Sequence, residues 1–234
     1  MTVIDRPSPN HDARPEGRAP DMIVMHYTGM KTGREALDRL CDPSAKVSAH
    51  YVIEEDGTVY HLVPEDQRAW HAGVSSWAGE TDINGCSIGI ELVNPGHEFG
   101  YRAFPEAQMQ ALERLAGEVA ARHAIAPGRV VGHSDVAPLR KQDPGELFDW
   151  PRLAAKGIGL WPARATNRTQ PRWSLKDIQA ALQGIGYGIE ITGDADELTH
   201  AVLTAFQRHF LPKNLTGLAD GPTIGRLLDF AAFF

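Results

Sequence analysis

The sequence predicts an α/β domain with a central mixed β-sheet flanked by helices, followed by a small all-α domain of three helices. Three observations lead to this prediction. Apolar strand-like runs alternate with helical patterns up to about residue 156, and an Asp-Gly hairpin joins two β-rich runs. Beyond a proline-containing segment, only helical patterns remain. We therefore divide the chain into residues 1–159, a linker at 160–172 and a helical domain at 173–234.

Short apolar runs bounded by turn residues are the predicted strands of the first domain. The clearest signal is a hairpin, because Asp56-Gly57 lies between two β-rich runs and Asp-Gly favours a tight turn. Alternation within SIGIELV puts the two isoleucines and the leucine on one face. Four prolines in residues 1–20 exclude a helix there and predict an extended arm. The predicted strands are residues 22–25, 51–53, 58–60, 87–93 and 129–131.

Helical patterns mark two segments of the first domain and the whole of the second. Thr32 is positioned to cap a short helix that ends at Leu40. Pro105 suits the first turn of a longer helix that reaches His123. The helical patterns of the second domain cover residues 174–182, 197–210 and 222–233. A unit of about 60 residues of this kind is small but can fold by itself.

The composition fits a folded protein and argues against two classes of function. The 23 basic and 30 acidic residues give a net charge of −7, the opposite of the basic footprint of a nucleic-acid-binding protein. Hydrophobic residues make up 42% of the chain, which is enough for a core. No apolar run reaches the roughly 18 residues that a membrane span needs. We therefore expect neither a nucleic-acid partner nor a transmembrane segment.

The cysteines and the first residues bear on the compartment. Cys41 and Cys86 are too few for a disulfide framework, and we predict two free buried thiols rather than one pair. Residues 1–21 contain no apolar stretch of signal-peptide length. We therefore expect a cytoplasmic protein, with the periplasm as the alternative if the native start carries a signal.

Two of the ten histidines occupy special positions in the predicted sheet. His26 and His133 each directly follow a short apolar strand, where a rigid scaffold holds a side chain that still faces solvent. Proline and glycine in residues 134–145 predict a loop that can fold Asp143 back toward His133. Two imidazoles and one carboxylate would form a three-ligand metal site with a fourth position open for water. Spacing alone leaves open that these are ordinary polar residues.

Glu91 and Lys141 are the candidate catalytic residues. Glu91 stands in an otherwise apolar strand, where desolvation would raise its pKa toward that of a general base near neutral pH. The alternative is an edge strand with this carboxylate in solvent. Lys141 precedes Asp143 by two residues and from there could stabilise an oxyanion, whereas the alternative is a solvated loop lysine.

Five ordered segments resemble the zinc-dependent N-acetylmuramoyl-L-alanine amidases. The resemblance spans roughly residues 5–157. The implied fold is also similar to that of phage amidase-type lysozymes and peptidoglycan recognition proteins. The matching segments are IVMHYT (23–28), VSAHY (47–51) with the Asp56-Gly57 turn, WHAG (70–73), SIGIE (87–91), and GHSD (132–135) continuing to KQDPG (141–145).

The resemblance implies a role for each residue that matches a family motif. It assigns Zn²⁺ binding to His26, His133 and Asp143. It makes Glu91 the carboxylate that activates water and Lys141 the group that stabilises the oxyanion. Substrate contact or support of the site is implied for three further residues, His50, His71 and Arg140.

Two positions separate this chain from the phage relatives. Those proteins have a cysteine as third metal ligand and a tyrosine just before the hairpin histidine. This chain has Asp143 and Ala49 at the matching positions, which places it on the bacterial branch that uses a glutamate.

The second domain resembles a peptidoglycan-binding module of three helices. The segments that carry this resemblance are LKDIQAAL (175–182), GIGY (184–187), AFQR (205–208) and DGPT (220–223). The alternative is a helical cap that only packs on the first domain.

Together the resemblances imply hydrolysis of the amide bond between N-acetylmuramic acid, or its 1,6-anhydro form, and L-alanine of the peptidoglycan stem peptide. The expected setting is cell-wall turnover or recycling, and the expected partner is muropeptide or peptidoglycan, with no obligate protein partner. The main alternative is a non-catalytic recognition protein with the same fold and ligand. A lytic enzyme used against competitors or in phage release would cut the same bond.

Overall fold

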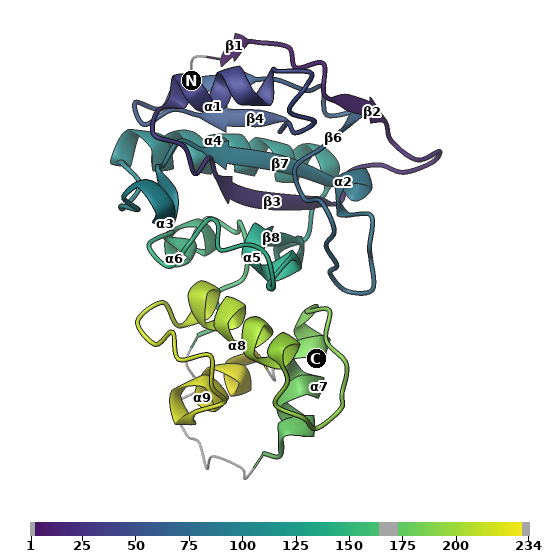
Figure 1. The fold of residues 1–234 in the computed structure, drawn as a ribbon, viewed down its shortest axis with the longest axis vertical. Helices are drawn as coiled ribbons and strands as arrows, with labels where there is room; N and C mark the ends of the chain where they lie inside the picture. The colour runs from purple at the N-terminus through teal and green to yellow at the C-terminus, as the bar shows by residue number, and fades with distance from the viewer. Residues whose placement is uncertain (1–2, 164–172, 231–234) are drawn as a thin grey trace.

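A mixed six-stranded sheet forms the centre of the first domain (Figure 1). The computed structural model describes residues 3–163 and 173–230. Within the sheet only the β4–β5 hairpin is antiparallel, and the other neighbouring strands are parallel. In spatial order the strands are β1 (Val3–Asp5), β5 (Val59–His61), β4 (Tyr51–Ile53), β7 (Ser87–Leu92), β3 (Met22–Tyr27) and β8 (Val130–Gly132). A separate antiparallel pair joins β2 (His11–Ala13) and β6 (Gln67–Ala69).

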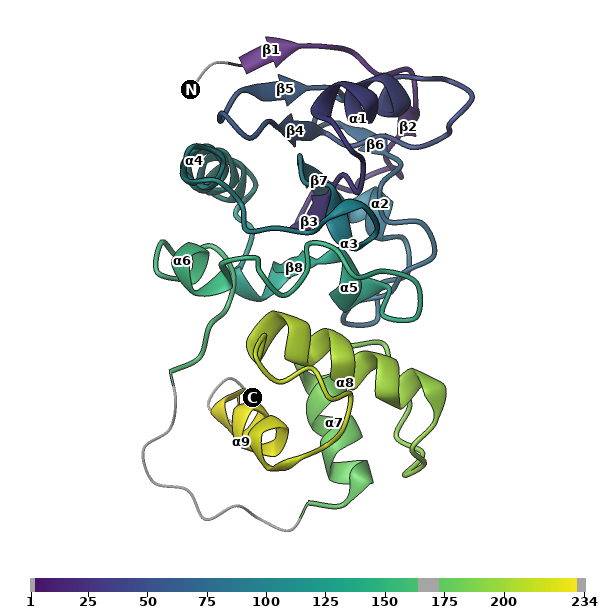
Figure 2. The same ribbon diagram turned by 60° about the vertical axis from the view of Figure 1, so that its left-hand side comes forward.

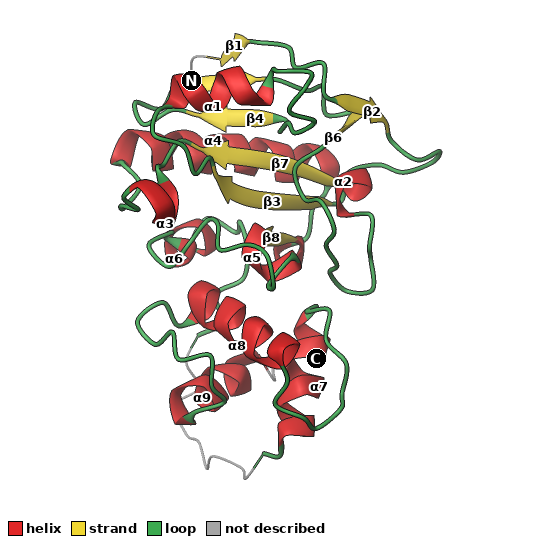
Figure 3. Ribbon diagram, in the orientation of Figure 1, coloured by secondary structure: helices red, strands yellow, loops and turns green. Residues whose placement is uncertain are grey.

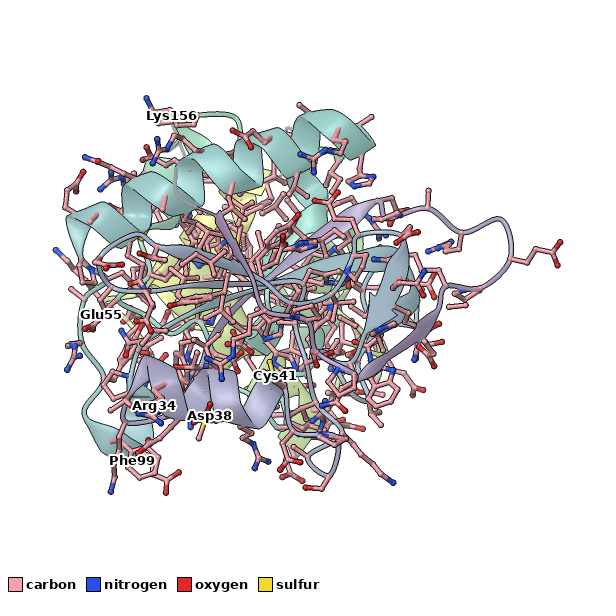
Figure 4. The ribbon with its side chains drawn as sticks, turned by 90° about the horizontal axis from the view of Figure 1, so that it is seen from above. Arg34, Asp38, Cys41, Glu55, Phe99 and Lys156 are labelled. Carbon is pink, nitrogen blue, oxygen red and sulfur yellow. The ribbon has the colours of Figure 1, made fainter. Side chains whose placement is uncertain are left out.

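Helices cover the two faces of this sheet unequally. The long helix α4 (Glu106–His123) and the short helix α1 (Gly33–Leu40) lie on opposite sides, and Arg34 and Asp38 on α1 point away from the sheet (Figure 4). On the α4 side, the isoleucines of β7 are fully buried in a core shared with that helix. On the other side, α1 packs against Val52 of β4, so the face of β3 and β7 beyond it is free to carry polar side chains.

Five short helices complete the first domain (Figure 3). They connect the strands and position the loops at the carboxyl ends of β3, β7 and β8. These helices are α2 (Ile83–Cys86), α3 (Gly96–Phe99), the 3₁₀ helix η1 (Pro127–Arg129), α5 (His133–Val136) and α6 (Trp150–Ala154).

The second domain consists of α7 (Leu175–Ile185), α8 (Glu197–Phe210) and α9 (Gly221–Asp229). Its helices are capped by Ser174, Asp196 and Asp220, whose side chains each accept a backbone N–H of the first turn. The α8 helix lies against the side of the first domain that carries α5 (Figures 1 and 2). Apolar residues of β8 and α5 share one hydrophobic core with α7 and α8, so the two domains are packed together.

The predicted architecture is confirmed, with local corrections. The prediction of a simple extended arm was incomplete, because residues 3–5 and 11–13 pair as strands with β5 and β6. The strand predicted over 22–25 continues to Tyr27, so His26 lies within β3 rather than after it. The predicted loop after β8 begins with the helical turn α5.

Three further predictions concern the cysteines, the domain boundaries and the absence of a membrane span. Cys41 and Cys86 are both free, but only Cys86 is fully buried. The boundaries proposed for the domains stay predictions, and residues 164–172 of the proposed linker lie outside the described residues, as do residues 231–233 of the last predicted helix. Among the helices described, none is long and apolar enough to cross a bilayer.

Candidate active site

The sheet register brings the predicted site residues to one edge and one face. His26 on β3 is the direct neighbour of Glu91 on β7, and Met25 is the neighbour of Gly132 on β8. Because these three strands are parallel, their carboxyl ends meet at the same edge, where ligands bind in open α/β sheets. His133 follows β8 directly and so lies beside His26.

Three side chains converge at this edge on a single point. The Nδ1 atoms of His26 and His133 are 2.9 Å apart. Asp143 Oδ2 lies 3.0 Å from each of them. All three residues are buried, and Asp143 is brought close because its carbonyl accepts the backbone N–H of Ser134 at 2.9 Å. The predicted fold-back of the 134–145 segment therefore occurs.

A chain of hydrogen bonds fixes the protonation of His26. Ser87 Oγ donates to the carbonyl of Ile83, so it accepts the Nε2–H of His71 at 3.2 Å. His71 Nδ1 is then an acceptor, and His26 Nε2 must donate to it across 3.0 Å. Burial lowers the pKa of His26 to about 4, with further lowering by the neighbouring His133, so the ring is neutral. Its Nδ1 therefore carries a lone pair.

The same reasoning applies to the other two groups. His133 Nε2 lies 3.1 Å from the carbonyl of Ala72, which can only accept, so His133 Nδ1 is also unprotonated when the ring is neutral. The Asp143 carboxylate contributes a third lone pair through Oδ2. Three lone pairs directed at one point repel each other unless a cation lies between them. The donor set therefore fits a metal ion, and two imidazoles with one carboxylate match catalytic zinc sites.

Glu91 is partly buried, and one of its carboxylate oxygens is fully enclosed. Its Oε2 is buried and has no hydrogen-bond partner among the described residues. Burial raises its pKa to about 8; the nearby Asp143 carboxylate adds to this effect and Lys141 opposes it. A carboxyl group with this pKa can accept and return a proton near neutral pH. The alternative of a solvated edge strand is wrong, because β7 lies between β4 and β3.

Two cations come from the turn after α5. The backbone N–H groups of Arg140 and Lys141 both donate to the carbonyl of Ala137 at 3.0 Å, which closes the turn. The Arg140 guanidinium also donates to the carbonyls of Ala72 and Val74, so it ties this turn to the WHAG segment.

A cavity of about 390 Å³ opens over these groups. Its walls include Ala36 and Arg39 of α1 and Trp70 at the start of the WHAG segment. Seven of the eight predicted site residues line it, namely His26, His71, Glu91, His133, Arg140, Lys141 and Asp143. The cavity therefore holds the metal-binding groups, the candidate base and both cations together.

His50 is the predicted site residue that does not line this cavity. It is fully buried, its Nδ1 accepts the backbone N–H of Gly89 at 2.9 Å, and its Nε2 lies 3.1 Å from the carbonyl of Gln67. These contacts join β7 to β6 and leave no group for a ligand. His50 therefore lies behind the cavity surface, between β6 and β7.

His71 lines the cavity and also bonds to His26. Its ring packs over Gly89, where a Cβ atom would lie 2.5 Å from the ring. The glycine in SIGIE is therefore required by the close approach of this imidazole.

Sequence reasoning missed two residues that hold the site. Ser87 orients His71, and Asn84 Oδ1 accepts the backbone N–H groups of His71 at 3.1 Å and Ala72 at 2.8 Å. Strand alternation offered a signal for Ser87, since positions 87, 89 and 91 share one face. No comparable signal marks Asn84, whose role depends on a loop contact.

Comparison with known proteins finds a matching sequence family for each of the two domains. A sequence model of the family described as N-acetylmuramoyl-L-alanine amidase matches residues 16–146. A second, describing a peptidoglycan binding domain, matches residues 174–227. The Escherichia coli K12 N-acetylmuramoyl-L-alanine amidase AmiD is 38% identical over 225 residues, which cover 86% of this chain and 79% of the relative. The Citrobacter freundii 1,6-anhydro-N-acetylmuramyl-L-alanine amidase AmpD is 37% identical over 166 residues. These residues cover 64% of this chain and 87% of that relative.

Solved structures agree over nearly the full length. E. coli AmiD in complex with anhydro-N-acetylmuramic acid-L-Ala-D-gamma-Glu-L-Lys superposes with a TM-score of 0.80 and 34% identity, covering 94% of this chain and 93% of its own. AmpDh3 from Pseudomonas aeruginosa gives a TM-score of 0.83 and 32% identity, covering 100% of this chain and 99% of its own. The similarity therefore includes both domains.

The raised pKa of Glu91 predicts a pH-dependent cost in stability. The folded-state pKa of about 8 lies above the ordinary value of 4.5, so stability is unaffected below pH ~4.5 and is lost as the pH rises through 8. In chelator-treated protein, Glu91→Gln should raise the free energy of unfolding by on the order of 3 kcal/mol at pH 8. Urea unfolding between pH 5 and 9 measures this difference. Glu98→Gln, at an exposed position, should follow the wild type, and parallel pH profiles for Glu91→Gln and wild type would contradict the assignment.

The hydrogen-bond chain to His26 predicts an effect on metal binding. Ser87→Ala removes the acceptor that fixes His71, so the tautomer of His26 is no longer held, and affinity for Zn²⁺ should fall about 10-fold. Competition with a chromophoric chelator gives the affinity. Ser75→Ala is the matched control, since Ser75 is also buried and donates to a backbone carbonyl but has no link to His71. Equal affinities for the Ser87 variant and wild type would exclude the orienting role.

Proposed function

This chain belongs to the N-acetylmuramoyl-L-alanine amidase family, and from that membership we propose that it is a zinc hydrolase of muropeptides. The bond cleaved joins the lactyl carbonyl of N-acetylmuramic acid to the amine of L-alanine. The observation that carries the proposal is the point of convergence of His26, His133 and Asp143 beside Glu91, all at the wall of one cavity.

The metal would be held by His26 Nδ1, His133 Nδ1 and Asp143 Oδ2. Zinc supplies Lewis acidity when bound: it polarises a carbonyl and makes water more acidic. The protein's contribution is to aim both Nδ1 atoms at one point, through the contact of His26 Nε2 with His71 and of His133 Nε2 with the Ala72 carbonyl.

Glu91 and Lys141 supply the proton transfers and the charge stabilisation. The Glu91 carboxylate takes a proton from the water that attacks the amide carbonyl, and its pKa of about 8 lets it hold that proton. It then gives the proton to the nitrogen of L-alanine as the C–N bond breaks, which leaves a carboxylic acid and a free peptide. The ammonium of Lys141, at the cavity wall, stabilises the negative charge that develops on the carbonyl oxygen.

We propose that the 1,6-anhydro muropeptide is among the substrates. The AmiD structure that superposes on this chain contains an anhydro-N-acetylmuramic acid peptide, and an AmpDh3 structure contains an anhydromuramic pentapeptide. The stem peptides of peptidoglycan carry carboxylates. Arg39 and Arg140 at the cavity wall offer them positive charge in a chain whose net charge is −7.

We propose that the helical domain binds peptidoglycan. The match of residues 174–227 to the peptidoglycan binding domain family supports this role. Co-sedimentation with insoluble peptidoglycan tests it, and a full-length chain that stays in the supernatant would contradict it.

Hydrolysis is tested with purified protein and 1,6-anhydro-MurNAc-tripeptide. We expect release of the free peptide, detected by mass spectrometry, with loss of activity on chelation and recovery on addition of Zn²⁺. Glu91→Gln should lower the rate by at least about 100-fold while Zn²⁺ affinity is kept, since this residue moves protons and is not a ligand. Intact substrate that nevertheless binds would instead indicate a recognition protein.

The cytoplasmic location stays a prediction. Fractionation of cells that express the native gene at its own level tests it, with the mass of the recovered protein showing whether a signal has been removed. Recovery of a processed form from the periplasm would contradict the cytoplasmic assignment and favour a role on the wall itself.

A further inference from the structure

A buried carboxylate of the first domain is held by the second domain. Asp135 in the GHSD segment is almost fully buried. Its Oδ1 accepts the Tyr187 hydroxyl at 2.7 Å, and its Oδ2 accepts His209 Nδ1 at 2.7 Å. Tyr187 follows α7, and His209 lies near the end of α8, so both donors come from the helical domain.

Asp135 also holds the turn that presents a metal-binding residue. Its Oδ2 accepts the backbone N–H of Gly132 at 2.7 Å, which caps α5 at the point where His133 begins the helix. The next residue, Ser134, donates its backbone N–H to the carbonyl of Asp143. The turn therefore carries one member of the metal-binding set and contacts another. A displacement of Asp135 would move both.

The two donors are themselves fixed by packing across the domain boundary. The His209 ring stacks on Trp150 of α6 with centroids 3.8 Å apart, and its Nε2 has no partner within the described parts of the chain. Among the described residues, the hydrogen bond to Asp135 is therefore the polar contact of the His209 ring, and the stacking on Trp150 holds the ring in place for it. Trp77 meets Tyr187 edge to face at 5.0 Å, and the backbone N–H of Ala78 donates to the carbonyl of Gly186 at 2.7 Å. Because of this packing, Tyr187 and His209 cannot shift to keep their hydrogen bonds if the Asp135 carboxylate moves.

We propose that the helical domain is a structural part of the metal centre. Tyr187 and His209 are positioning residues: they hold Asp135, Asp135 holds the turn at Gly132, and the turn holds His133 at the metal. Loss of these contacts weakens metal binding even when both domains remain folded. This inference concerns the metal site and stands independently of which amide bond the protein cleaves.

Coupling of this kind acts in both directions. If docking of α8 favours the metal-binding position of His133, bound metal must favour docking of α8 by the same factor. Removal of the metal is therefore expected to speed backbone hydrogen exchange in the 130–137 segment and also in α8. Without such a link, metal removal would speed exchange in the 130–137 segment, which contains the ligand His133, but would leave α8 unchanged.

The test uses the full chain and two conservative variants. Tyr187→Phe keeps the ring and removes one donor, whereas His209→Phe keeps a ring for stacking on Trp150 and removes the other. We expect each to bind Zn²⁺ about 10-fold more weakly in chelator competition, the usual scale for groups that support a ligand. Hydrogen exchange of the 130–137 segment should be faster in both variants with the metal removed, which is a readout independent of hydrolysis.

Val202→Ala is the matched control. Val202 lies on α8 and is fully buried in the shared core, so its truncation destabilises the domain by a cavity without removing a donor to Asp135. It should lower the melting temperature yet leave Zn²⁺ affinity and exchange at 130–137 close to wild type. The proposal fails if Tyr187→Phe and His209→Phe bind Zn²⁺ as tightly as wild type. It also fails if Val202→Ala weakens binding as much as they do.

Discussion

The convergence of three unprotonated donors is the constraint on which the rest of this structure depends. His26, His133 and Asp143 direct lone pairs at one point from separate segments of the chain, which is unfavourable unless a cation compensates. The fold must therefore hold each donor against repulsion. It does so with hydrogen bonds that the far side of each imidazole donates, His26 to His71 and His133 to the Ala72 carbonyl.

The same face of the sheet also carries a carboxyl group, that of Glu91, whose ionisation is unfavourable. Glu91 is partly buried near Asp143, and both desolvation and this neighbouring charge oppose its ionisation. A core designed for stability alone would have an apolar residue there. The isoleucines of β7, on the opposite face against α4, provide the apolar burial that offsets this cost.

The position of the helical domain follows from the same need for rigidity. Its α8 helix packs along α5, the turn that begins with His133, and both donors to Asp135 come from this domain. The two domains are thereby joined by buried hydrogen bonds from Tyr187 and His209 to Asp135. Such contacts can carry an effect of binding from one domain to the other.

The sequence by itself determined the strands, the Asp56-Gly57 hairpin, the long helices and the set of groups that could bind metal, because hydrophobic periodicity, turn residues and motifs are local signals. It left His50 and His71 without a definite role, and it gave no sign of the link between Asp135 and the second domain. Only the tertiary structure decided these, because each depends on hydrogen bonds between residues distant in the chain. Tautomers, burial and the direction of a side chain are set by neighbours that no local pattern specifies.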